Sequence, residues 1–375
     1  MIILAAAIIL SLSNSGIIGK ANKAKADTDI SNAKDLVAMA HADWMLDEVK
    51  IKENDNTITS FSNYSEKKLQ EAGYKVGAGE GAYTVTEDGE VYTGLTETAR
   101  AGITAGIKIG DEVKYSAVLT AKSYTTDGSE ITSTGAANST LAKTVKTNTS
   151  YTWKYIGLGE DGSLLIAPDM TGTIGEDYKL SLGDKGGFLN GPKMLNTVCD
   201  ALYTVEGKGK AQSMNIELVN KLLEYNGPKG IYFDANYNAV KTAEPKTIGE
   251  TGLVSSLDSN TQTPDGKDIS AYYADYYGIN KTYQASIITK DTVRQNLVYQ
   301  ANTYWLASPC VRAVFGNGSA DFSVRCVSSS SVDAYDVFIS FGRADGNTYA
   351  VRPYVSLTTN VQKTTENGKT VWTLS

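Results

Sequence analysis

Histidine and cysteine are scarce in this chain of 375 residues, and their scarcity excludes most catalytic and metal-binding chemistry. The one histidine, His41, falls in a segment with helical periodicity, so a mechanism that needs a histidine base has no other source. The three cysteines, Cys199, Cys310 and Cys326, have neither the spacing of a metal site nor the number of a disulfide framework. We therefore expect no catalytic residue, no metal site and no cofactor.

Positive charge is also in short supply. The chain has 35 Lys and Arg against 42 Asp and Glu, which gives a formal net charge of −7. A nucleic-acid partner would favour a basic stripe on the protein, so we expect no nucleic-acid partner. Asp-Gly pairs recur along the sequence, but none has the spacing of an EF-hand loop, and we interpret them as hairpin turns.

The N-terminus begins with a wholly apolar run, MIILAAAIIL, over residues 1–10. This run is shorter than the roughly 20 residues of a membrane span, and it lacks the basic start of a secretory signal. Apolar residues then recur at helical spacing, at Ile30, Ala33, Val37, Ala40 and Trp44. The pattern predicts a helix over about residues 1–46, on the order of 70 Å long, which is apolar first and amphipathic later.

The passage NSGIIGKANKAKADTDISNAKDLVAMA, residues 14–40, resembles the N-terminal helix of type IV prepilin-like proteins of Gram-positive bacteria. The resemblance implies a cell-surface location, contact with the membrane before assembly, and pilin-like partner subunits bound through residues 1–46. The glycine and glutamate of a prepilin-peptidase site are absent from this sequence. A cleaved signal peptide that ends at residues 24–26, Ala-Lys-Ala, is the alternative, and both interpretations place the protein outside the cytoplasm.

The middle of the chain changes from helical to alternating periodicity at about residue 81. Alternating segments flank the pairs Asp88-Gly89, Asp127-Gly128 and Asp161-Gly162, and each pattern predicts a β-hairpin. Two helices are expected between the strands, one in residues 191–207 and one in residues 214–227 that begins at Asn215. Residues 241–300 show no clear periodicity, and we expect a long excursion on the surface there.

The C-terminal block, residues 304–357, consists of short alternating strands separated by Gly and Ser. In DFSVRCV, residues 321–327, Val324 and Cys326 alternate with Ser323 and Arg325. We expect Trp305 in the core, and Arg325 and Arg352 in the framework, where a guanidinium group can clamp carbonyls or carboxylates. A final hairpin is expected around Asn367-Gly368.

The segments YWLASPCV, FGNGSADFSVRCV, VFISFG and YAVRPYVSL resemble the end of the C-type-lectin-like fold shared with formylglycine-generating-enzyme-type domains. Together with YTWKYIGLGEDGSLLIAPD upstream, the resemblance covers most of residues 105–357. It implies an α+β fold, with a long pilin-like helix followed by a mainly antiparallel β domain that has two short helices. The expected organisation is an anchor helix at 1–50, a connecting region with a hairpin at 51–104, a lectin-like module at 105–357 and a hairpin at 358–375.

Chemically assorted side chains lie between the framework residues of this block, and they are of the types that paratope-like surfaces use. The predicted ligand-binding residues are Arg312, Val314, Ser323, Ser328, Ser329, Asp333, Tyr335, Asp336, Ile339, Phe341, Arg343 and Asp345. The wider lectin-like group includes variable proteins rewritten by diversity-generating retroelements, so the resemblance implies a face open to diversification. We predict an adhesin-like protein for an unknown surface ligand, protein or glycan, and expect Tyr335, Asp336 and Phe341 to be exposed together.

Two other functions fit the sequence less well. The first is a structural, pilin-like filament subunit without a specific ligand. The second is an enzyme of the formylglycine-generating type, because Cys310 and Cys326 echo that enzyme's cysteine pair, although no other part of its site is present. The two cysteines are open to either interpretation, as scaffold thiols or as a disulfide.

Overall fold

The computed structural model describes residues 17–115, 122–126, 144–224, 231–233, 239–242, 283–284, 291–314, 319–339 and 346–375. Its helices and mostly antiparallel strands confirm the α+β class. The chain divides into two compact units, Met1–Ile107 with Leu158–Ser163, and Lys108–Gly157 with Leu164–Ser375. We call them the N-terminal unit and the C-terminal unit.

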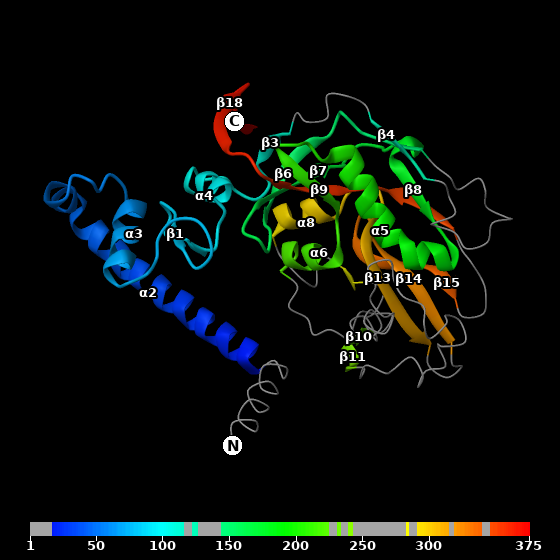
Figure 1. The fold of residues 1–375 in the computed structure, drawn as a ribbon, viewed down its shortest axis with the longest axis horizontal. Coiled ribbons are helices and arrows are strands. Elements are labelled where there is room, and N and C mark those ends of the chain that lie inside the picture. Colours follow the sequence, from blue (N-terminus) through cyan, green and yellow to red (C-terminus); the bar gives the residue numbers. More distant parts are fainter. Residues whose placement is uncertain are drawn as a thin grey trace, which may run out of the picture. The chain divides into compact units, whose positions relative to one another are not determined.

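The N-terminal unit is built on a long helix, α2, Ile17–Asn54, which departs from helical geometry at Asp47. Its other elements are α3, Phe61–Glu71, the hairpin of β1, Tyr83–Val85, and β2, Val91–Thr93, and α4, Glu97–Thr104 (Figure 1). The predicted helical pattern is confirmed along α2, whereas residues 1–16 lie outside the described part. None of the helices in the described ranges combines the length and the apolar character needed to cross a membrane.

Residues 51–104, where we expected a connecting region with a hairpin, contain α3, the β1–β2 hairpin and α4 and belong to this unit. One face of α2 buries Ala33, Val37 and Trp44, and this face packs on the buried rings of Phe61 and Tyr64 from α3. The rings of Trp44 and Tyr64 lie 5.8 Å apart. An amphipathic helix needs such an apolar partner, and the segment after α2 supplies it.

Short-range polar contacts fix where the smaller helices of this unit begin. Ser60 caps α3 by accepting a hydrogen bond from the backbone N–H of Asn63, at 3.3 Å. Glu87, from the β1–β2 turn, accepts hydrogen bonds from the N–H groups of Phe61 and Ser62, at 3.2 and 3.3 Å, and from the Ser62 hydroxyl. A carboxylate at this position offsets the partial positive charge of the helix N-terminus.

Hairpin turns lie at Asp88-Gly89 and at Asn367-Gly368, as predicted. β1 and β2 pair through Val85 and Val91, and Gly89 takes φ of 85°. Asn367 and Gly368 have φ of 50° and 77°, the positive values that a two-residue hairpin turn requires. The turn at Asp127-Gly128 lies outside the described residues.

The C-terminal unit contains two large sheets. The first has the strand order β18-β19-β3-β6-β7-β17-β9, and the second has the order β12-β15-β14-β13-β16-β8. The first sheet comprises β3 Glu112–Lys114, β6 Thr152–Leu158, β7 Leu164–Asp169, β9 Gly209–Ser213, β17 Pro353–Leu357, β18 Val361–Glu366 and β19 Lys369–Leu374. The second comprises β8 Lys179–Leu182, β12 Tyr283–Gln284, β13 Tyr304–Val314, β14 Ser319–Val327, β15 Ser331–Ile339 and β16 Asn347–Ala350.

The C-terminal hairpin expected in residues 358–375 consists of β18 and β19, and it is part of the first sheet. β19 pairs in parallel with β3 through Trp372 and Val113. Trp372 is fully buried, and its indole N–H donates a hydrogen bond to Asp111, at 3.0 Å. Two shorter ribbons accompany the sheets, β4 Ser123–Thr125 with β5 Thr144–Lys146, and β10 Ile231–Phe233 with β11 Ala239–Thr242.

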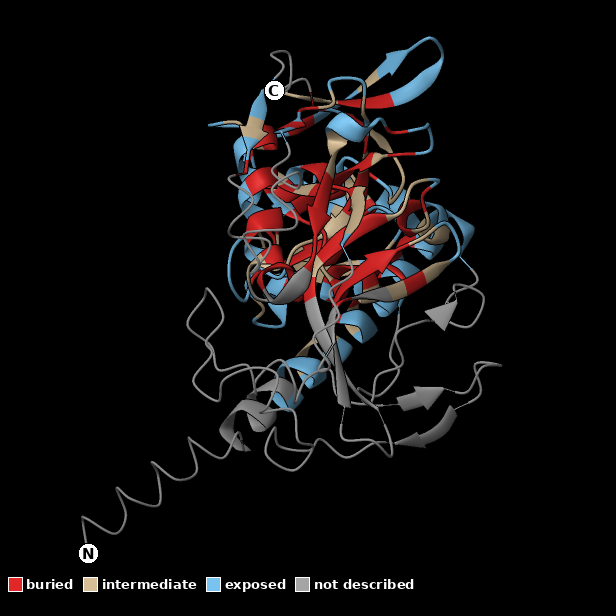
Figure 2. Cartoon of the chain, turned by 90° about the vertical axis from the view of Figure 1, so that its right-hand side faces the viewer, coloured by how far each residue is buried: buried red, intermediate tan, exposed pale blue. Residues whose placement is uncertain are grey.

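Helices α5, Asp184–Tyr203, α6, Ile216–Leu222, and α8, Thr292–Val298, pack on these sheets, and η3, Glu176–Tyr178, precedes β8. Asn215 caps α6 as predicted, and Cys199 of α5 is buried. α5 has 20 residues, so it is longer than the short helix expected, and α8 is an additional helix. Buried residues fill the interior of the unit (Figure 2).

The expected surface excursion, residues 241–300, is corrected at its end. Leu297 and Val298 of α8 are buried in the same core as Tyr304 and Val327. α8 spans only about two turns, and its apolar residues are too few to show helical periodicity in the sequence. Residues 243–282 and 285–290 lie outside the described part.

The cap of α3 gives a testable pH dependence. Partial burial of Glu87 favours its neutral form, but the hydrogen bonds from Ser60, Ser62 and the backbone hold its pKa below the usual range. Its stabilising effect is therefore fully present above the unfolded pKa of about 4.3 and is lost as the pH falls through the lower folded pKa. At pH 7 we expect E87Q to weaken α3 by about 0.5 kcal/mol, after solvent screening.

Hydrogen exchange of the α3 amides measures this effect. E87Q should speed exchange relative to wild type at pH 7, and the difference should shrink as the pH falls through the lowered folded pKa of Glu87. E90Q is the matched control, because Glu90 is exposed on the same hairpin. Equal protection in E87Q and wild type at pH 7 would contradict the assignment of Glu87 as a cap.

Candidate binding face

Arg352 is a fully buried side chain that joins three segments of the C-terminal unit. Its guanidinium group donates hydrogen bonds to the carbonyl oxygens of Pro168, at 3.1 Å, Leu297, at 2.6 Å, and Val298, at 3.5 Å. It also donates to the hydroxyl of Tyr304, at 2.9 Å, and its Cζ lies 4.8 Å from the centre of that ring. The expectation of an arginine that clamps carbonyl groups is confirmed for Arg352, and these carbonyl groups belong to β7 and α8.

Tyr304 and Trp305 begin strand β13 and lock it to its neighbours. The Tyr304 hydroxyl donates to the carbonyl oxygen of Val298, at 2.8 Å, so it accepts from Arg352 and donates to α8 at once. Burial raises the pKa of Tyr304, and this effect outweighs the opposing effect of Arg352. Because its pKa is raised, the phenol stays neutral and can donate a hydrogen bond. Trp305 is fully buried as predicted, and its indole N–H donates to the carbonyl oxygen of Leu180, at 2.8 Å.

Two amide side chains that the sequence did not single out complete this framework. The Gln300 Oε1 accepts a hydrogen bond from the N–H of Met170, at 2.5 Å, and the Asn302 Oδ1 accepts one from the N–H of Ile174, at 3.1 Å. Asn302 also donates to the carbonyl oxygen of Met170, at 2.9 Å. Such contacts join residues far apart in sequence, and no local pattern in the sequence could have indicated them.

Strands β13, β14 and β15 lie side by side on this framework (Figure 1). They have 11, 9 and 9 residues, which makes them the longest strands in the described part of the chain. The ladder is irregular between Trp305 and Pro309, and again between Phe322 and Ser323. Irregularities of this kind bend a strand, and they are frequent at sheet edges and next to functional sites.

The structure places Ser323 in the interior, which corrects its assignment to an exposed face. Ser323 and Arg325 are each 1% exposed, and Val324 and Cys326 on the opposite face are also buried. Helix α5 packs against β13, β14 and β15, while α6 also packs against β13. Polar and apolar residues alternate in this strand, yet both of its faces are covered.

Three predicted residues lie in or beside the β14–β15 turn. Ser328 is half-buried and holds the turn, because its backbone N–H donates to the carbonyl oxygen of Ser331, at 2.9 Å, and its hydroxyl lies 2.8 Å from the Ser331 hydroxyl. Ser329 is exposed, and Asp333 is half-buried opposite Cys326. Ser328 thus has a structural task in the turn, whereas Ser329 is accessible.

Backbone register brings five further predicted residues onto the same three strands. Arg312 of β13 lies opposite Asp321, which in turn lies opposite Ile339 of β15. Val314 pairs with Ser319, Tyr335 with Val324, and Asp336 with Ser323. The side chains of Arg312, Val314, Tyr335, Asp336 and Ile339 lie outside the description, as do the whole residues Phe341, Arg343 and Asp345.

The structure describes the side chains of Cys199 and Cys326, whereas the side chain of Cys310 lies outside the description. Cys199 and Cys326 are buried thiols, and burial raises the pKa of Cys199, which disfavours the thiolate that a nucleophile needs. Cys326 lies opposite Trp305 in the ladder, whereas Cys310 lies opposite Ser323. Across the described ranges, His, Cys, Asp and Glu do not gather into a group of three or more that could hold a metal ion.

Comparisons of the chain with protein-family models, with curated proteins and with solved structures gave no match.

The Arg352 clamp predicts a large loss of stability when it is removed. R352M keeps most of the side-chain volume but removes the donor to the carbonyl groups of Pro168 and Leu297, while Val298 keeps its bond from Tyr304, and we expect a cost of about 2–4 kcal/mol. Urea unfolding of the full chain should show a lower midpoint with an unchanged slope. K363M, on the exposed part of β18, is the control and should keep the wild-type midpoint. A midpoint for R352M at or above that of wild type would contradict this prediction, because the buried charge would then destabilise the fold.

Proposed function

We propose that the chain is a cell-surface or pilus-associated binding protein that presents residues 312–347 as an adhesin-like face on a C-type-lectin-like scaffold. The observation that carries the proposal is the fixed base that holds the three longest described strands, β13 to β15, side by side. At one end Tyr304, Trp305 and Val327 are fully buried and tied to Arg352 and to β8. The strands then continue beyond this fixed base through Val314, Ser319 and Ile339.

A rigid base is what a variable or adaptable binding face requires. Binding orders side chains at a cost in entropy, and a scaffold that holds the strands in place lowers that cost. The three strands and their turns carry arginine, tyrosine, serine and aspartate, which suit hydrogen bonding with a glycan or a polar protein surface. Substitution at these positions leaves the Arg352 and Trp305 contacts intact, so we propose that the face tolerates diversification.

Binding arrays test this proposal. We would apply the labelled full chain to an array of immobilised glycans and to an array of extracellular-matrix proteins. The face variant replaces Arg312, Tyr335 and Asp336 with alanine, and we expect it to lose at least about tenfold in affinity for whichever probe wild type binds. The control variant replaces Gln362, Lys363 and Thr365 of β18 with alanine, since all three are exposed.

The control variant should bind as wild type does, and both variants should keep the wild-type unfolding midpoint. Equal affinity of the face variant and wild type would contradict the proposal. So would the absence of wild-type binding on both arrays.

A specific feature of α2 supports the second candidate, a pilin-like filament subunit. Met45, Leu46 and Val49 are 73%, 84% and 69% exposed, and Met39 is 66% exposed. They lie away from the face that Val37 and Trp44 bury, so the helix has apolar residues on two sides. Apolar side chains of this number on one exposed helix are typical of a surface that packs against a further helix.

Assembly of the purified full chain tests this second candidate. We propose that M45Q combined with L46Q abolishes higher-order assemblies, because glutamine removes the apolar contact while it preserves helix propensity. K34Q combined with E53Q alters two other exposed positions of α2 and should assemble as wild type does. Light scattering and electron microscopy give the readout. Unchanged assembly of the Met45 and Leu46 variant, or a wild-type chain that stays monomeric, would reject this candidate.

A further inference from the structure

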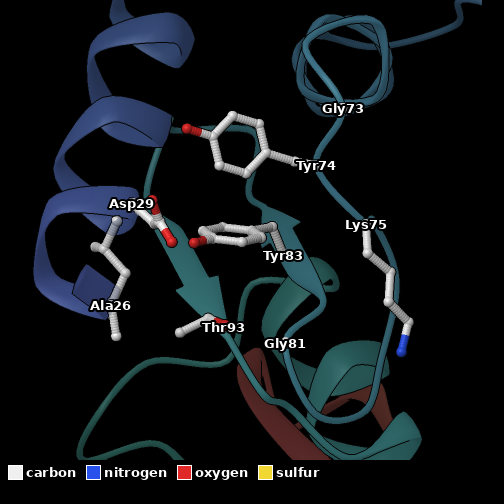
Figure 3. Close-up of a pocket in the computed structure, with 9 residues that line it drawn as sticks. Ala26, Asp29, Gly73, Tyr74, Lys75, Gly81, Tyr83 and Thr93 are labelled. Atoms are coloured by element: carbon white, nitrogen blue, oxygen red, sulfur yellow. The ribbon is translucent and has the colours of Figure 1, made fainter. Parts of the chain in front are cut away.

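A pocket of about 340 Å³ lies in the N-terminal unit, between α2 and the β1–β2 hairpin (Figure 3). Its walls come from three places in the sequence: the described start of α2, the segment after α3, and the hairpin itself. Residues that line it include Ala26, Asp29, Ile30, Tyr74, Lys75 and Tyr83. All belong to one compact unit, so the pocket is formed within that unit alone.

One side of the pocket carries a carboxylate and two aromatic rings. Asp29 projects from α2 toward the hydroxyl end of Tyr83, and Tyr74 lies above them (Figure 3). The two tyrosine rings are 5.1 Å apart at an interplanar angle of 75°, so they form a corner rather than a flat stack. Tyr83 is 8% exposed, whereas Asp29 and Tyr74 are half-buried and in reach of a ligand.

The described part of the chain supplies no cation to this carboxylate. Lys75 also lines the pocket, but its ammonium group points away from Asp29 and donates to the carbonyl oxygen of Glu80, at 3.2 Å (Figure 3). Among the residues whose side chains are described, no lysine or arginine forms an ion pair with Asp29. Burial, together with the charge of Asp29, raises the pKa of Tyr83 and keeps that phenol neutral.

We propose that this pocket binds the ammonium group of an aliphatic amine, such as a lysine side chain presented by a partner protein. A carboxylate attracts the charge and accepts its hydrogen bonds, and a tyrosine ring face attracts a cation through its quadrupole. Ile30 and the methyl group of Ala26 offer apolar contact to the methylene stem of the amine. The proposal goes beyond the adhesin-like face, because the pocket is in the other unit and shares no residue with strands β13 to β15.

The dimensions and the charge of the pocket favour this ligand over others. A butylammonium group has five heavy atoms, and at roughly 30 Å³ for each water-sized group it occupies about 150 Å³. It therefore fits into the pocket of about 340 Å³. An anion would face the charge of Asp29. A wholly apolar ligand would remove water from that carboxylate without replacing its hydrogen bonds, which is unfavourable.

Titration of the full chain with Nα-acetyl-lysine methylamide, followed by NMR, tests the proposal. The same probe acetylated at Nε is the neutral comparison, and it should bind at least about tenfold more weakly because it lacks the charge. D29N should weaken binding of the charged probe by about tenfold or more, and Y74L by about fivefold through loss of the ring face. D27N is the matched control, since Asp27 is an exposed aspartate two residues away on α2, and it should bind within about twofold of wild type.

Y83F keeps the buried ring, so the unit should remain folded, and the variant tests the hydroxyl group alone. We expect its affinity for the charged probe to fall by no more than about threefold. Equal binding of the charged and the neutral probe would overturn the proposal, as would wild-type affinity in both D29N and Y74L. Absence of binding by wild type at millimolar probe would also overturn it. The variant with Arg312, Tyr335 and Asp336 replaced should bind the lysine probe as wild type does, so failure of the adhesin-like face and failure of this pocket are distinguishable.

Discussion

The contacts of one buried arginine hold the C-terminal unit together. In the sequence, Arg352 links β16 of the second sheet to β17 of the first sheet. Its guanidinium group donates to carbonyl groups at the end of β7 and in α8. A buried charge is unfavourable unless it is satisfied, and here three carbonyl groups and the Tyr304 hydroxyl share that task. Because these partners lie far apart in the chain, the clamp forms only when both sheets and α8 are in place.

Local signals in the sequence predicted the parts of the fold that local physics decides. Asp88-Gly89 and Asn367-Gly368 give turns because their glycines adopt positive φ at little cost, and Asn215 begins a helix because its side chain accepts an orphan N–H. The burial of Trp305 and the role of Arg352 also followed from residue chemistry. A bulky indole favours the interior, and a guanidinium fork favours clustered carbonyl groups.

Features that depend on several layers of structure could not be predicted in this way. Ser323 alternates with apolar residues as if it faced water, but it is buried, and α5 packs against β14. α8 and the amides of Gln300 and Asn302 lie in a segment without periodicity, and their partners are about 130 residues away in the chain. The pocket at Asp29 joins α2 to a hairpin that follows 54 residues after it, from Asp29 to Tyr83. In each case the decisive partner is distant in sequence.

The central claim is that strands β13 to β15 leave this fixed base as an accessible face. Covalent labelling of the full chain in solution tests it most directly, with hydroxyl radicals for Tyr335 and Phe341 and a carbodiimide for Asp336. We expect Tyr335 and Phe341 to react with hydroxyl radicals close to the intrinsic rates of their residue types, and Asp336 to react with the carbodiimide as exposed Asp27 does, while Tyr304 and Trp305 stay protected. Protection of Tyr335, Asp336 and Phe341 at the level of Tyr304 would place them in a core and would contradict the account.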